Sequence, residues 1–340
     1  PETQGIRRLN LRELVLEGLT SSRVASVLVV LAVAWQYLDD LLPKATYERL
    51  LRNMAEGFAR WTERAGEQVW LQAALIILGV ALASVLLSVI GAVIAFHGFT
   101  LSRRGEDLHR SWGLLTRRSS SLPRRRIQVL KIEEQLLRRW LKLATIRADT
   151  AGGAATRQEG KEGRDVLLPL ARRDELERLL PEFFPDLEPT GDDWRQVSRR
   201  AIRRGTVKGT VVLALLAGAL FAVQRQWYDL WPLALTPLVY WLNVVSYRRL
   251  GYHSGANYFR TRRGWLDRAT HIVPIRNAQA IVLRQTPLDR HHRVGTLLVD
   301  TAGQAYTGGG PRIQNVPWPE ALALARTLAQ RAAATRYRWR

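Results

Sequence analysis

Long uncharged stretches separate segments in which apolar and polar residues alternate. The longest uncharged stretch, Val69–Phe96, has 28 residues. A helix that rises about 1.5 Å per residue crosses about 30 Å of hydrocarbon with roughly 20 residues. Shorter apolar stretches lie near residues 24–38, 209–224 and 230–247. The pattern predicts four transmembrane helices in two hairpins, although a buried core helix remains the alternative for the two shortest stretches.

The predicted spans cover about residues 22–42 and 69–96 in the first hairpin and about 207–224 and 229–247 in the second. Between the first two spans, apolar residues recur at helical spacing over residues 44–65, and charged residues occupy the other side. This stripe predicts an amphipathic helix at the outer membrane surface, or helical extensions of the two spans.

The segments that follow the two hairpins repeat each other. Residues 113–152 overlay residues 264–303 without a gap after a shift of 151 positions, and both copies end in Asp-Thr-Ala-Gly. In each copy, apolar and polar residues alternate around a Gly turn and a Pro break, which is typical of successive antiparallel strands. Helix-forming segments close the copies at residues 171–180 and 319–331. The repeat predicts a small antiparallel β-barrel or sandwich, capped by a C-terminal helix and present twice.

The predicted fold class is therefore α+β, in a membrane protein with four parts. An N-terminal segment and the first hairpin occupy residues 1–96, and a first barrel domain, called domain A, occupies residues 97–190. A linker and the second hairpin occupy residues 191–250. The second barrel domain with its C-terminal helix, called domain B, occupies residues 251–340.

The distribution of charge predicts the orientation. The net charge is +21, and basic residues gather where the predicted spans adjoin domains A and B. The opposite ends carry aromatic and acidic residues, such as Trp227 and Asp229. Because basic flanks favour the cytoplasmic side, we expect both domains and both termini in the cytoplasm. Lys208, near the cytoplasmic end of the third span, is expected to reach toward the headgroups.

The basic residues of domain A form a candidate surface for anionic phospholipid. These residues are Arg117, Arg118, Arg124, Arg126, Lys131, Arg138, Arg139 and Lys142. Each Lys or Arg near an anionic membrane contributes about 1 kcal/mol, and a solvated positive face is the alternative interpretation. Strand alternation would place Arg124 and Arg126 on one face and Arg125 on the other. A nucleic-acid partner is disfavoured because the charge lies beside the spans without interleaved aromatic residues.

The motifs that suggest chemistry lack the residues that the chemistry needs. With no cysteine, the chain has no disulfide and no thiolate nucleophile or ligand. The segment from Asp300 to Gln304 resembles a GTPase switch sequence, but no Gly-Lys-Ser/Thr loop accompanies it. His271, His291 and His292 lack the spacing of metal ligands. We therefore predict no enzymatic activity, no cofactor and no metal.

Several short motifs occur in order in domain B: Gly-Trp-Leu, Val-Pro, Arg-x-x-Gln and Gln-x-Pro-Leu-x-Arg. The last spans Gln285 to Arg290, and domain A keeps only its Leu and final Arg. Together with the hairpins, these motifs resemble the bacterial pleckstrin-homology (PH) family of YdbT-like membrane proteins. The resemblance implies a seven-stranded barrel closed by a helix, in a multi-pass protein of the bacterial inner (plasma) membrane. YdbT-like proteins often carry a further such domain upstream, which fits a sequence that starts at Pro1 without an initiator Met.

These observations predict a non-enzymatic integral membrane scaffold. Its two cytoplasmic PH-like domains would mediate protein–protein assembly, docking on anionic phospholipid, or both. The expected partners are the lipid bilayer and either further copies of the chain or another membrane protein. The alternative is a component of a lipid-handling or peptide export/resistance system, which the few polar residues within the predicted spans support only weakly.

Overall fold

The computed structural model describes residues 3–21, 52–53, 69–151, 166–188, 193–302 and 310–335. It contains two compact units. The N-terminal unit comprises Glu2–Arg103 and His109–Ser120, and the C-terminal unit comprises Pro1, Arg104–Leu108 and Ser121–Arg340. The predicted span at residues 22–42 and nearly all of the predicted outer helix at residues 44–65 lie outside the described residues.

Helices and one sheet make up the N-terminal unit. Helix α1 (Leu11–Thr20) packs against α4 (Val69–Phe96), and the Ser88 hydroxyl donates a 2.8 Å hydrogen bond to the Gly18 carbonyl. A four-stranded sheet of order β1-β2-β3-β4 lies mostly in this unit. Its strands are β1 (Thr3–Arg8), β2 (Thr100–Arg104), β3 (Asp107–Trp112) and β4 (Arg118–Pro123).

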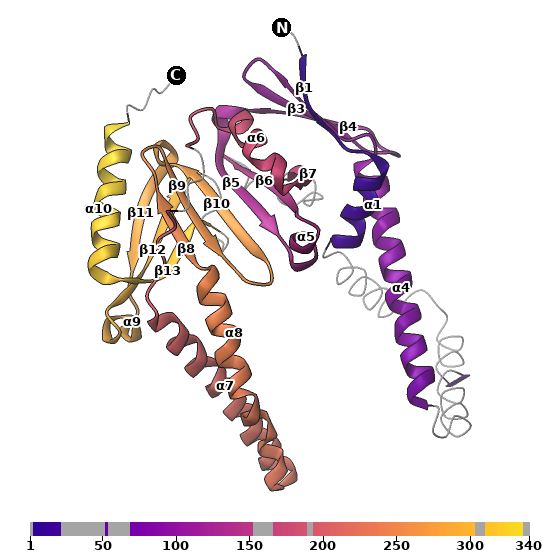
Figure 1. The fold of residues 1–340 in the computed structure, drawn as a ribbon, viewed down its shortest axis with the longest axis vertical. Helices are drawn as coiled ribbons and strands as arrows, with labels where there is room; N and C mark the ends of the chain where they lie inside the picture. Colours follow the sequence, from indigo (N-terminus) through magenta and orange to yellow (C-terminus); the bar gives the residue numbers. More distant parts are fainter. Residues whose placement is uncertain are drawn as a thin grey trace. The chain divides into compact units, whose positions relative to one another are not determined.

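A six-stranded sheet of order β7-β6-β5-β10-β9-β8 dominates the C-terminal unit (Figure 1). Domain A contributes β5 (Ile127–Glu134), β6 (Leu143–Thr150) and β7 (Val166–Arg172). Domain B contributes β8 (Gly251–Ser254), β9 (Tyr258–Arg263) and β10 (Arg268–Pro274). The two halves meet where β5 pairs antiparallel with β10, from Glu134 opposite Arg268 to Leu130 opposite Ile272.

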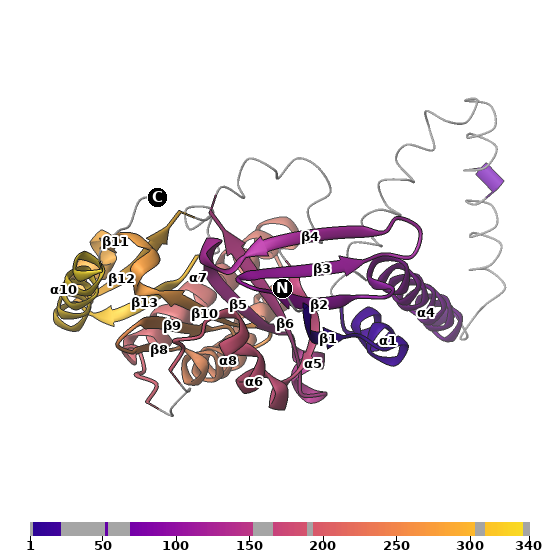
Figure 2. The same cartoon turned by 90° about the horizontal axis from the view of Figure 1, so that it is seen from above.

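The second sheet of domain B has the order β11-β12-β13. It comprises β11 (Ala278–Arg284), β12 (Val294–Thr301) and β13 (Arg312–Pro317). Helix α10 (Trp318–Ala334) covers it, and its buried residues Ala321, Ala325 and Leu328 recur at helical spacing (Figure 2). Val129 of β5 is buried in the same apolar cluster as these residues, so the two domains share a core.

The predicted repeat is confirmed element by element. Five elements of domain A begin 151 residues before their counterparts in domain B: β2 and β8, β3 and β9, β5 and β11, β6 and β12, and the short helices α5 (Leu136–Trp140) and α9 (Pro287–His291). Closing helices follow in both, at α6 (Arg173–Phe183) and α10. Both Asp-Thr-Ala-Gly sequences begin at the ends of strands, as expected from a turn.

Contrary to the prediction, the described strands do not form one independent barrel or sandwich in each repeat, because one sheet runs through both domains. In the described residues each repeat contributes six strands, which together with β1 form sheets of four, six and three strands. The six-stranded sheet runs through both domains because the edge strand β5 of domain A pairs with the edge strand β10 of domain B. Edge pairing of this kind satisfies backbone groups that would otherwise be exposed.

Two helices in the described residues are long and apolar enough to cross a membrane. They lie at Leu78–Phe96 in α4 and Arg200–Ala222 in α7 (Arg200–Gln224). The predicted span at residues 229–247 is not one continuous α-helix. A 3₁₀ helix, η3 (Trp227–Leu235), contains Pro232 and leads into α8 (Thr236–Arg249), which has only 14 residues. Pro232 cannot donate a backbone hydrogen bond, which explains the break. Four transmembrane helices are therefore not confirmed.

Glu134 should hold the two domains together through the β5–β10 pairing. Its carboxylate is buried and lies 3.2 Å from the Arg268 guanidinium, which is itself only 11% exposed. Replacing Glu134 with Gln leaves a largely buried cation without its counter-charge, so we expect a loss of about 3 kcal/mol in the free energy of unfolding. Thermal unfolding and amide hydrogen exchange in β10 would measure this loss. The exposed substitution Glu177→Gln is the matched control, and equal effects of the two would contradict the prediction.

Candidate functional site

Three of the eight basic residues predicted to contact lipid are held by short or buried contacts within the protein. The Arg138 side chain is buried and donates hydrogen bonds to the Thr145 hydroxyl and, at 3.2 Å, to the Pro169 carbonyl. Arg139 donates a 2.6 Å bond to the Trp265 carbonyl of domain B. Lys131 lies 2.5 Å from the Glu133 carboxylate. These contacts give the three side chains structural roles.

The other five predicted residues are more accessible. Arg117, Arg118, Arg126 and Lys142 are exposed, and Arg124 is half-buried, with a 3.3 Å hydrogen bond to the Pro181 carbonyl. Lipid contact by these residues stays a prediction.

The predicted strand alternation at Arg124, Arg125 and Arg126 is wrong. These residues form a short 3₁₀ helix after Pro123, which ends β4. With three residues per turn, the three side chains point in three different directions.

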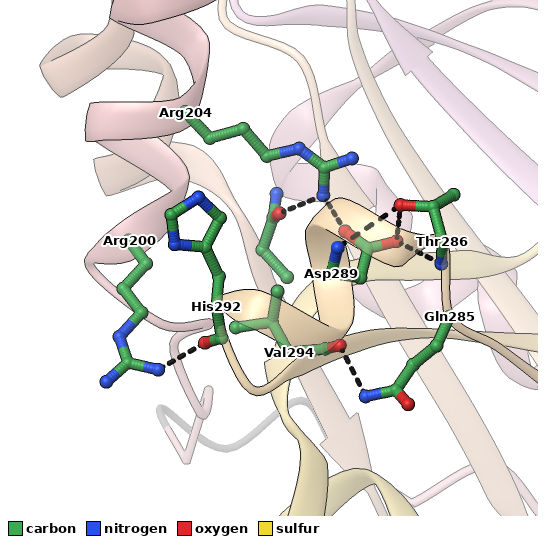
Figure 3. A network of polar contacts seen from close by, with 8 residues as sticks. Arg200, Arg204, Gln285, Thr286, Asp289, His292 and Val294 are labelled. Carbon is green, nitrogen blue, oxygen red and sulfur yellow. Dashed lines mark hydrogen bonds and ion pairs between the residues drawn. The ribbon is translucent and has the colours of Figure 1, made fainter.

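A polar network that sequence reasoning did not identify lies where α7 meets α9 of domain B (Figure 3). Thr286 caps α9: its hydroxyl accepts a 3.2 Å hydrogen bond from the Asp289 backbone N–H. The Asp289 carboxylate accepts bonds from the Thr286 N–H and hydroxyl at 2.9 and 2.7 Å. This reciprocal arrangement is a capping box, and it fixes the Asp289 carboxylate toward α7.

Helix α7 approaches this capped turn with two arginines. Arg204 forms an ion pair with Asp289 and donates a 3.2 Å hydrogen bond to Asn315. Arg200 donates to the His292 carbonyl, which follows α9. Gln285 joins the start of the turn to β12 through a 2.9 Å bond to the Val294 carbonyl (Figure 3). The two variable positions of the Gln-x-Pro-Leu-x-Arg motif, Thr286 and Asp289, thus fix domain B against the base of α7, and Gln285 ties the turn to β12.

The network determines the charge of Asp289. Burial by itself would raise the pKa of the Asp289 carboxyl. The hydrogen bonds from Thr286 and the positive charge of Arg204 outweigh burial and hold the pKa below its ordinary value. Asp289 is therefore ionised at neutral pH and neutralises Arg204.

A cavity of about 380 Å³ lies beside the network, between the base of the second hairpin and domain B. Arg204 and Lys208 of α7, Arg284 of β11 and Arg312 of β13 supply its cations, and Asp289 is its one acidic lining residue. Among the residues that the structure describes, no hydrogen bond or ion pair engages the side chains of Lys208, Arg284 or Arg312. The lining therefore has a net positive charge.

The positive charge extends beyond the lining. Burial, together with the like charge of Arg312, lowers the pKa of the nearby Arg263. An anion entering the cavity would meet unbalanced positive charge.

Domain A lacks this cationic arrangement at the corresponding positions. The shift of 151 residues relates Arg284 to Glu133 and Asp289 to Arg138. Glu133 pairs with Lys131 and, at 2.9 Å, with Arg147. The Arg138 guanidinium binds Thr145, whose counterpart Thr296 lines the cavity in domain B. The two repeats therefore carry opposite charges at these two pairs of equivalent positions.

Two glycines allow α7 and α8 to approach closely beside the cavity. A methyl group at Gly205 would overlap the Asn243 side chain, and one at Gly209 would overlap Val239. The spacing is the small-xxx-small pattern of helix pairs in membranes. The sequence Gly-Thr-Val-Lys-Gly could have revealed this contact, whereas nothing local in the sequence revealed the pairing of Arg204 with Asp289.

The histidines do not come together as a metal site in the described residues. His271 is buried in β10, whereas His291 and His292 lie at the end of α9 with ring centroids 5.1 Å apart. No group of three or more His, Asp or Glu side chains in the described ranges is arranged to hold a metal ion.

Comparison with known proteins gives one family and one relative. The model of the Bacterial PH domain family matches residues 57–182 and 203–332. UPF0699 transmembrane protein YdbT from Bacillus subtilis (strain 168) is 22% identical over 305 residues. The alignment covers 90% of this chain and 59% of the relative, so the chain spans about three fifths of that protein's length. No solved structure matches.

The Asp289–Arg204 contact should make stability depend on pH at the acid end. Because folding lowers the pKa of Asp289, its stabilising contribution is present above its ordinary value of 3.8 and is lost as pH falls through the lower folded value. We expect Asp289→Asn to lower the unfolding temperature at pH 6, and the difference from the unsubstituted chain to shrink below about pH 4. Thermal unfolding at both pH values measures this. A difference that stays constant with pH would contradict the ion-pair assignment.

Proposed function

The chain belongs to the bacterial PH domain family, and from this premise we propose that it is a non-enzymatic membrane scaffold that docks its PH-like domains on an anionic bilayer surface. It is a YdbT-like transmembrane protein with two such domains. We also propose that the chain crosses the membrane four times and that both PH-like domains face the cytoplasm.

The observation that carries the proposal is the exposed apolar and basic surface of α5 in domain A. We call it the α5 surface: Leu136, Leu137, Trp140, Leu141 and Lys142. Trp140 is 81% exposed, and the three leucines are between 41% and 54% exposed. Apolar side chains beside an exposed Lys, with a Trp among them, are typical of a segment that enters the interface of an anionic membrane.

The position of the α5 surface within the repeat supports a membrane as its partner. Its counterpart in domain B, α9, lies at the base of α7, where Leu288 and Val207 line one shared cavity. Because α7 contains a candidate membrane span, this end of a PH-like domain is the end nearest the bilayer. Equivalent ends of the two repeats would then both face lipid.

The second hairpin supports two spans and the cytoplasmic orientation. Segments η3 and α8 together would extend about 39 Å, at about 2.0 Å per residue in the 3₁₀ part and 1.5 Å in the α part, which is sufficient to cross a bilayer. Arg248 and Arg249 end α8 beside domain B, whereas Trp227 and Asp229 lie at the other end. This asymmetry follows the positive-inside rule.

The docking proposal can be tested at Leu141, since the chain has no native cysteine. We expect a fluorophore on Leu141→Cys to be quenched by spin-labelled lipid when the full chain is reconstituted with phosphatidylglycerol. With phosphatidylcholine alone we expect less quenching, because Lys142 gains no attraction from neutral lipid. The matched control is Arg326→Cys on the exposed side of α10. Equal quenching at the two positions, or none at Leu141, would contradict docking.

The same labelled variants test orientation. An impermeant thiol reagent should reach Arg326→Cys in inverted vesicles and not in right-side-out vesicles. The reverse accessibility would place domain B on the opposite side of the membrane and overturn the cytoplasmic orientation.

A second role, assembly with another protein, is favoured by the free edge of β11. In the described part of the chain β11 is an edge strand, with Ala280 and Val282 exposed, whereas its counterpart β5 is paired. Such an edge can accept a strand from a partner. In the repeat, β11 is the counterpart of β5, and β4 is the counterpart of β10. If β11 of one copy paired with β4 of another in the register of β5 and β10, Arg284 would lie opposite Arg118. These like charges would repel, so pairing between two copies is unfavourable.

The partner at this edge is therefore proposed to be a different membrane protein. We expect the chain purified in mild detergent to carry such a protein, and Val282→Pro to release it by blocking strand pairing. Leu266→Pro, in an exposed turn, is the control. Light scattering that shows a bare monomer would contradict assembly, and a homo-oligomer would identify a second copy instead.

A further inference from the structure

We propose that the basic cavity at the base of the second hairpin is a binding site for the phosphate of an anionic phospholipid headgroup. The cavity is the one between α7, α8, β11 and β13, and its ligands would be Lys208, Arg284 and Arg312. The inference deepens the proposed function, and it depends on that function only in placing domain B at a membrane surface.

Three separate elements direct cations toward the same space. Arg284 ends β11, Arg312 begins β13 and Lys208 lies on α7. Arg204, the fourth cation, is held by Asp289 and Asn315 and so forms a fixed wall rather than a ligand. A phosphate group accepts several charge-assisted hydrogen bonds at once, which suits a site with two unengaged guanidinium groups.

The residues of α7 and α8 that line the cavity place it at the level of the lipid headgroups. Lys208 directly precedes the uncharged stretch of residues 209–224, and a Lys at this depth extends toward the interface. On α8, the cavity is lined by Asn243, Ser246 and Tyr247, just before the Arg248-Arg249 pair. A lipid beside α7 would therefore present its phosphate to the cavity while its chains remain against the apolar part of the helix.

The internal repeat supplies an argument for a built site rather than a generally basic surface. Domain A places Glu133 where domain B has Arg284, and Lys131 and Arg147 neutralise that glutamate. Because the charge changes sign at an equivalent position, we expect the site in domain B and not at the corresponding place in domain A.

The test uses the full chain, delipidated in detergent and titrated with phosphatidylglycerol, with bound lipid counted by native mass spectrometry. We expect the double substitution Arg284→Gln and Arg312→Gln to weaken the tightest lipid site about 25-fold, at about fivefold per arginine. The control is Arg178→Gln with Arg326→Gln, which removes the same charge from exposed positions on α6 and α10. It should leave that site unchanged.

Each outcome bears on the proposal. Equal weakening by both double variants, or equal affinity of the unsubstituted chain for phosphatidylcholine and phosphatidylglycerol, would overturn it. Competition by millimolar inorganic phosphate as effective as that by the lipid would identify the free anion as the ligand and overturn the headgroup assignment. An unchanged unfolding temperature shows that the cavity variant is folded. Quenching at Leu141→Cys reports α5 docking separately, so failure of either proposal is recognised independently.

Discussion

The antiparallel pairing of β5 with β10 is the interaction on which the arrangement of the two PH-like domains depends. Five consecutive residue pairs join the strands, from Glu134 and Arg268 to Leu130 and Ile272. The pairing satisfies two exposed strand edges at once, and it places Val129 of domain A in the core of domain B. Strands of both repeats are therefore fixed in one sheet rather than linked by a flexible connection.

The second hairpin is coupled to the three-stranded sheet of domain B through a short capped turn, α9, which lies between β11 and β12. Thr286 and Asp289 stabilise α9, and Asp289 then neutralises Arg204 at the base of α7. A carboxylate that receives several hydrogen bonds before it meets its cation has little freedom to move, so the pair fixes direction as well as charge. Residues of the family motif thus have a structural function here, because they connect a candidate membrane-spanning helix to domain B.

The two repeats share a fold and differ in electrostatics. At the equivalent positions, Arg138 is bonded internally in domain A, whereas Asp289 faces α7 in domain B. In domain A, α5 has an exposed apolar surface, and in domain B, Lys208, Arg284 and Arg312 line a cavity. The duplicated fold thus has an exposed apolar surface in domain A and a cationic cavity in domain B.

The sequence by itself determined the local structure and the repeat. The 151-residue shift located equivalent strands, the uncharged stretches located α4 and α7, and Gly205 and Gly209 mark a close helix contact. Pro232 also marks the break before α8, a local signal that the prediction of a continuous span overlooked. Only the tertiary structure decided that β5 pairs with β10 and that Arg204 meets Asp289. Alternation specifies which face of a strand is buried, but it does not specify which distant edge or helix provides the partner.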